Sequence, residues 1–136
     1  MLVVTAEQMR EMDRLTIQKH GVPSLTLMER AGEGITAAIL KSFAAAAKKG
    51  VLIVAGKGNN GGDGFVVARL LKKKRIPCEV ALLAKRTELS PDAAHNCHAL
   101  PALFTPEAGA AAARQITAKS AAVRTIPGWT CAKRMA

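Results

Sequence analysis

Two asparagines and an aspartate, Asn59, Asn60 and Asp63, lie among five glycines within residues 56–64. Amide and carboxylate oxygens are the ligands that hard cations and substrate hydroxyls require. The glycines put no side chain between a ligand and the backbone N–H groups, so these groups can bind an anion. The segment could therefore hold a cation and a phosphate side by side.

Gly56, Gly58 and Gly61 also fit the dinucleotide-binding pattern G-x-G-x-x-G, which is a weak signal alone. The acidic residue that should end the next strand and hold a ribose is missing, because Glu79 stands near the start of that strand. Asp63 would repel a pyrophosphate docked on the loop. No Gly-Lys-Ser/Thr ends the segment, so it is not a Walker A loop. An NAD(P)-dependent oxidoreductase and a non-catalytic nucleotide-binding module are the alternatives.

The elements around this segment predict a β-α-β unit. The apolar, mostly β-branched residues 51–55 predict a buried strand. An amphipathic run from Phe65 to about Lys74 predicts the next helix, and residues 77–84 predict a second, parallel strand. Open α/β sheets bind ligands at the carboxyl edge of such strands. A simpler role for Asp63 is the N-cap of the helix that follows.

Two helices are predicted ahead of the first strand. Thr5 begins a capping box that starts a helix reaching about residue 19. Ser24 is the expected N-cap of the second helix, which reaches about residue 47. Gly32 and Gly34 each weaken this helix by about 1 kcal/mol relative to alanine, so we expect both to pack closely against a neighbouring element.

Composition limits the class of protein and its partners. The 136 residues make one domain, and no apolar stretch is long enough for a membrane span. The formal net charge of +10 favours anionic partners. Aromatic residues make up 3% of the chain and no helix-turn-helix pattern is present, so we expect a phosphorylated small molecule and no nucleic acid. Three widely spaced cysteines and the lack of a signal pattern predict a cytoplasmic location.

The glycine-rich segment and the N-terminal residues resemble a known family. The Asn-Asn-Gly-Gly-Asp-Gly core at residues 59–64 is far more specific than G-x-G-x-x-G. Together with three N-terminal blocks in the right order, it resembles the NAD(P)HX epimerase family, the YjeF N-terminal domain, over residues 3–96. The three blocks are residues 5–13, 20–24 and 27–32.

This resemblance implies a Rossmann-like αβα three-layer domain with an N-terminal helical extension. It implies an isomerase of metabolite repair that interconverts the R and S epimers of hydrated NADH and NADPH, with K+ as cofactor. A homodimer is one assembly that it allows, and relatives can be fused to a dehydratase domain. It assigns no catalytic residue here. It assigns substrate binding to Asn59, Asn60, Gly61, Gly62 and Asp63, and the potassium site to Asn60.

The chain departs from the family after about residue 96. Family members continue into a third strand whose loop carries an aspartate. Residues 102–105 resemble that loop only weakly, because they lack its aspartate and both of its glycines. We therefore expect residues 1–96 to form a partial family domain and residues 97–136 to be a tail of different composition. A truncated or frameshifted coding sequence would explain the change, and the chain would then keep only half of the family's binding site.

Overall fold

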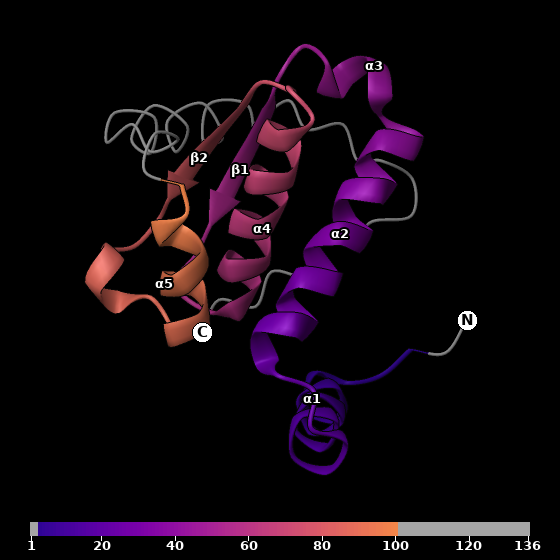
Figure 1. Cartoon of the computed structure of the whole chain (residues 1–136), viewed down its shortest axis with the longest axis vertical. Coiled ribbons are helices and arrows are strands. Elements are labelled where there is room, and N and C mark those ends of the chain that lie inside the picture. The colour runs from indigo at the N-terminus through magenta and orange to yellow at the C-terminus, as the bar shows by residue number, and fades with distance from the viewer. Residues whose placement is uncertain (1–2, 101–136) are drawn as a thin grey trace.

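A computed structural model describes residues 3–100 of the 136. Helices and strands alternate in the second half of this range, as an α/β fold requires (Figure 1). The elements are α1 (Ala6–His20), α2 (Ser24–Ser42), α3 (Ala44–Ala47), β1 (Val51–Ala55), α4 (Asn59–Lys73), β2 (Cys78–Leu82), the short 3-10 helix η1 (Arg86–Glu88) and α5 (Pro91–His98).

The two strands pair in parallel, which confirms the predicted β-α-β unit and the α/β class. Val51 pairs with Cys78 and Ala55 with Leu82, so both strands start at one edge of the sheet and end at the other. Helix α4 connects them and packs against both strands, and α2 lies along the outer side of α4 (Figure 1). Within residues 3–100 the sheet has these two strands.

The core lies between the sheet, α4 and α5. Seven buried residues form it, and side chains of β1, β2 and the segment before α5 pack around them. The inward face predicted for α4 is confirmed, since Val66, Val67 and Leu71 are buried and Leu70 is half-buried. The core members are Ala55, Phe65, Ala68, Val80, Ala93, Cys97 and Leu100.

The expectation that β1 is a buried strand holds for one of its faces in the described part of the chain and is wrong for the other. Alternate side chains of a strand point to opposite faces. Ala55 faces the core, whereas Leu52 and Val54 are 44% and 41% exposed on the other face. Helix α4 packs against both strands, and these two side chains stay partly open to solvent.

Helix α1 forms with all of its predicted local signals and stands apart from the core (Figure 1). The Thr5 side chain accepts from the Gln8 N–H, and the Thr5 N–H donates to the Gln8 side chain, which confirms the capping box. Gly21, at φ 64°, ends the helix in the left-handed conformation that glycine adopts easily. Helix α1 buries no residue.

Helix α2 corrects three expectations. Pro23 occupies the N-cap position and Ser24 is the first helical residue, with no side chain capping the helix. The helix ends at Ser42, because Phe43 leaves the helical conformation, and α3 then completes the predicted span. Gly32 packs closely against Val66 as expected, but nothing lies near Gly34.

The described range ends with α5. Ser90 caps α5 by accepting from the Ala93 N–H at 3.4 Å, with Pro91 in the first turn. Helix α5 continues past position 96 to His98. Cys97, within the helix, and Leu100, after it, belong to the core. Residues 102–105 and Cys131 lie outside the described residues. None of the helices in the range 3–100 has the length and apolar character that a bilayer span needs.

Candidate functional site

The glycine-rich segment is mostly helix, which is the main correction to the sequence analysis. Helix α4 begins at Asn59, not at Phe65, and only Gly56, Lys57 and Gly58 connect it to β1. Gly58 is the extended N-cap residue, and its carbonyl accepts from the N–H groups of Gly61 and Gly62 at 2.9 and 3.2 Å. Asp63 therefore sits inside the helix and is not its N-cap.

Close packing explains the helical glycines better than flexibility does. A Cβ on Gly61 would overlap the carbonyl oxygen of Gly56. A Cβ on Gly62 would lie 2.5 Å from the Met28 side chain and 3.2 Å from the Cα of Ala93. These glycines let α4 approach the preceding turn, α2 and α5. Both are buried on the interior side of the helix, and their contact with a substrate stays a prediction.

The polar residues of the same segment share the opposite side of α4. Residues three and four positions apart lie on one face of a helix, so Asn59 and Asn60 stand beside Asp63. All three line a pocket with a volume of about 160 Å³ between the start of α4 and helices α1, α2 and α5. The other lining residues are Asp13, Ile17, Ser24, Leu27, Met28, Ala31 and Asp92.

Sequence analysis missed Asp13 and Asp92. Asp13 comes from α1, fifty positions before Asp63, and as the last residue of the family-like block 5–13 it had no role assigned to it. Asp92 had a usable signal, since it opens the helix that follows β2 and therefore had to lie at the carboxyl edge of the sheet. The fold brings both carboxylates to the predicted site.

The pocket is acidic. Three carboxylates line it, and its lining includes no lysine or arginine. Burial raises the pKa of Asp63, and the nearby charge of Asp13 raises it further. Such a site favours cations and ligand groups that donate hydrogen bonds, and it disfavours phosphate.

An anion is better accommodated beside the pocket, at the first turn of α4. No side chain caps this turn, so its first N–H groups have no partner from a capping residue. Ser90 fixes the turn from the other side, because its N–H donates to the Lys57 carbonyl at 2.9 Å and its Oγ donates to Oδ1 of Asn59 at 2.7 Å. Lys57 is exposed next to this turn.

An ion pair joins the two helices that frame the site. The Glu29 carboxylate of α2 accepts from the Arg69 guanidinium of α4, and both side chains are about one-third exposed. It supports the packing of α2 on α4, which Gly32 already brings close. Among residues 3–100 no group of three histidine, cysteine, aspartate or glutamate side chains is arranged to hold a metal ion by itself.

Comparisons with known proteins identify the family of this chain. The family described as YjeF-related protein N-terminus matches residues 24–108. A bifunctional NAD(P)H-hydrate repair enzyme Nnr of Salinibacter ruber is 48% identical over 94 residues, which cover 69% of this chain and 17% of that enzyme. An NAD(P)H-hydrate epimerase of Oenococcus oeni is 45% identical over 91 residues, covering 67% of this chain and 43% of that protein.

A second bifunctional Nnr enzyme, from Moorella thermoacetica, is 42% identical over 97 residues, 71% of this chain and 18% of the enzyme. The chain thus spans less than half the length of these relatives, and the family also occurs within longer, bifunctional proteins. The family match covers more than half of the 136 residues and includes α2, both strands, α4 and α5. This chain belongs to the family of YjeF-related protein N-terminal domains.

Proposed function

We propose that this chain carries the nucleotide-binding half of an NAD(P)H-hydrate epimerase, an isomerase of metabolite repair whose substrates are hydrated NADH and NADPH. The observation that carries the proposal is the polar face of α4, where Asn59, Asn60 and Asp63 line one pocket at the carboxyl edge of the sheet. The name of the relative from Oenococcus oeni supports the same reaction.

The charges around α4 suggest how the substrate is oriented. Its pyrophosphate would lie at the uncapped first turn of α4 beside Lys57, since backbone N–H groups and a cation favour an anion. Its hydrated ring is uncharged and donates hydrogen bonds through the C6 hydroxyl and the carboxamide. Oxygens of the acidic pocket can accept those bonds, so we expect the ring there and the phosphates outside.

Potassium is the cofactor that we propose for this site, with Asn60 as one ligand. The donor set fits, because the pocket offers amide and carboxylate oxygens with no lysine or arginine among its lining residues. When bound, the ion would offset carboxylate charge and help to orient substrate oxygens. Epimerisation at C6 also needs a group that moves a proton. We assign that role to none of the residues in the range 3–100.

An epimerisation assay on purified (R)-NADHX tests the proposal. We expect formation of the S epimer above the spontaneous rate in potassium buffer and a lower rate when sodium replaces potassium. Asn60→Ala and Asp63→Asn should each reduce the catalysed rate at least ten-fold, since the first removes an amide from the pocket and the second removes a negative charge. Absence of catalysis by a chain whose fold is confirmed by circular dichroism would leave a binding role only.

A charge-matched control separates the site from general electrostatics. Glu33 is exposed on α2 and does not line the pocket, so Glu33→Gln removes the same charge as Asp63→Asn without touching the site. It should leave the rate unchanged. Titration with NADP addresses the oxidoreductase alternative, because that class should bind the unmodified cofactor better than the hydrated one.

The remaining features of the proposal concern the whole protein. We propose a cytoplasmic protein, for which the free thiols of Cys78 and Cys97 are one support. Residues 1–96 would be the family domain and residues 97–136 a tail of different composition. A homodimer and a dehydratase partner domain remain part of the proposal, and analytical ultracentrifugation of the full chain would test the first.

A further inference from the structure

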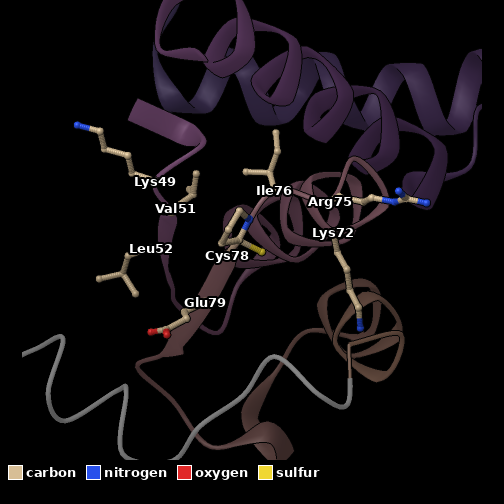
Figure 2. Close-up of a pocket in the computed structure, with 10 residues that line it drawn as sticks. Lys49, Val51, Leu52, Lys72, Arg75, Ile76, Cys78 and Glu79 are labelled. Carbon is tan, nitrogen blue, oxygen red and sulfur yellow. The ribbon is translucent and has the colours of Figure 1, made fainter. Parts of the chain in front are cut away.

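A second and larger depression lies at the other end of the sheet, where neither the family motif nor the proposed function makes use of it. It is an open groove of about 970 Å³, a size in the range of small-molecule sites (Figure 2). The strands begin here, and α4 ends here. Its lining residues are Lys49, Gly50, Val51, Leu52, Lys72, Arg75, Ile76, Pro77, Cys78 and Glu79.

The groove is separate from the acidic pocket. Helix α4 has 15 residues, and the pocket lies at its first turn while Lys72 lies in its last. At about 1.5 Å per residue, the two sites are roughly 20 Å apart. The groove is also opposite in charge, since three cations and one carboxylate line it.

Charge and apolar surface are arranged in a definite order across this groove. Figure 2 shows Lys49 and Glu79 on the strand side and Lys72 and Arg75 on the helix side. Between them lies an apolar floor made by Val51, Ile76 and Cys78. The Cys78 thiol is directed inward, as its Sγ donates to the Ala68 carbonyl at 3.5 Å. The charged ends of Lys49 and Arg75 point outward from this floor to opposite sides (Figure 2), so a ligand on the floor would lie between positive charges at the rim.

The backbone of Arg75 gives an independent reason to regard this arrangement as more than a charged helix end. Arg75 has φ 58°, and it is the one non-glycine residue with positive φ among residues 3–100. Its N–H donates to the Lys72 carbonyl at 2.9 Å, and the Ile76 N–H donates to the Leu71 carbonyl at 3.0 Å, as in a Schellman cap. That cap position favours glycine, so an arginine at this position has a conformational cost.

We propose that this groove, lined by Lys49, Lys72 and Arg75, binds an organic anion that carries negative groups on both sides of a flat apolar body. The apolar floor would bury the body of the ligand, and the cations on either side would pair with its anionic groups. Glu79 would accept a hydrogen bond from a ligand hydroxyl or amine. The proposal does not depend on epimerase activity, because the two sites share no residue.

Naphthalene-2,6-disulfonate is a suitable probe, since it is a flat apolar ring system with one anionic group at each end. Binding to the full chain is measured by isothermal titration calorimetry at low salt and again at higher salt. Lys49→Gln and Lys72→Gln should each weaken binding about five-fold, and salt should weaken it further. Lys48→Gln and Lys73→Gln are matched controls, because these exposed neighbours carry the same charge outside the groove, and they should change binding less than two-fold.

Arg75→Gly separates binding from folding. Glycine relieves the positive φ, so this variant should melt about 4 °C higher while it binds the probe about five-fold more weakly. Three results would overturn the proposal: equal weakening by all four lysine variants, no binding at millimolar probe, or loss of binding in Asn60→Ala but not in Lys72→Gln. The last result would place the probe at the first turn of α4. Failure of epimerisation alone would contradict the proposed function and not the proposal of a second site.

Discussion

Helices α1 and α4 have the same length of 15 residues, but they are specified in opposite ways. Helix α1 has a capping box, a left-handed glycine at its end and an ion pair between Glu11 and Arg14 along its surface, yet it buries nothing. Helix α4 has no side-chain cap and starts with two glycines in its first turn and a half, yet it buries seven residues.

The difference separates local from tertiary determinants of helix formation. Caps and surface pairs contribute about 1 kcal/mol or less each, so they decide where an isolated helix begins and ends. Burial of several side chains outweighs the glycine penalty of about 1 kcal/mol per residue. We therefore expect substitutions in α4 and its packing partners to act on the whole domain, and those in α1 to act locally.

Gly61→Ala should have the largest effect. The new Cβ would overlap the Gly56 carbonyl, a backbone group that cannot turn aside as a side chain can. We expect a loss of more than about 3 kcal/mol in the free energy of unfolding, enough to abolish a cooperative thermal transition. Gly58→Ala is the control, because nothing lies within 4 Å of its Cβ position. Similar melting curves for both variants would contradict the packing argument.

Two glycines of α2 should respond with opposite signs. Gly32→Ala places a Cβ 2.6 Å from the Val66 Cβ, and Val66 is fully buried, so we expect a loss of about 2 kcal/mol. Gly34→Ala meets open space and should gain about 1 kcal/mol, because alanine favours the helix. Urea denaturation measures both changes. A gain in Gly32→Ala would show that α2 is free to move away from α4.

These cases show what the sequence could predict of the fold. The bounds of β1 match the apolar run, and the Thr5 cap matches its motif, because each signal is contained in a few adjacent residues. The start of α4 and the different roles of Gly32 and Gly34 depend on contacts with other elements. A glycine that breaks a helix and one that lets two helices approach look alike in sequence.

The candidate site divides in the same way. Asn59, Asn60 and Asp63 could be identified as a group, since their types and spacing belong to one short segment. Asp13 could not, because it reaches the pocket only through the packing of α1 beside α2. Its contribution is a charge near Asp63, which depends on the arrangement of two distant helices in space.

Thr5→Ala should have a smaller effect, confined to α1. The variant loses the bond that the Thr5 hydroxyl accepts from the Gln8 N–H and keeps the bond that its own backbone N–H donates to Gln8, so we expect the helix to lose about 1 kcal/mol. Since α1 buries no residue, we expect its amide protons to exchange about five-fold faster while those of α4 are unchanged. Hydrogen exchange followed by mass spectrometry reads both helices at once. Faster exchange in α4 would mean that α1 supports the core after all.

The smallest expected effect concerns Asp13 of α1 and Asp63 of α4, which line the same pocket. Burial, and then the charge of Asp13, raise the pKa of Asp63 above its ordinary value, so the folded chain holds this proton to a higher pH than the unfolded chain does. Stability should therefore fall as the pH rises from the ordinary pKa through the raised one, and the penalty should be complete at neutral pH.

Asp63→Asn removes this penalty and should raise the melting temperature at pH 7, by at most about 2 °C because the carboxylate is partly exposed. The gain should vanish below the ordinary pKa, where aspartate is neutral in both states. Asp13→Asn should act in the same direction and less strongly, since burial is the larger cause. The measurements belong in potassium-free buffer. A lower melting temperature for Asp63→Asn at pH 7 would mean that this carboxylate stabilises the fold, and the acidic pocket would then need no ligand to explain it.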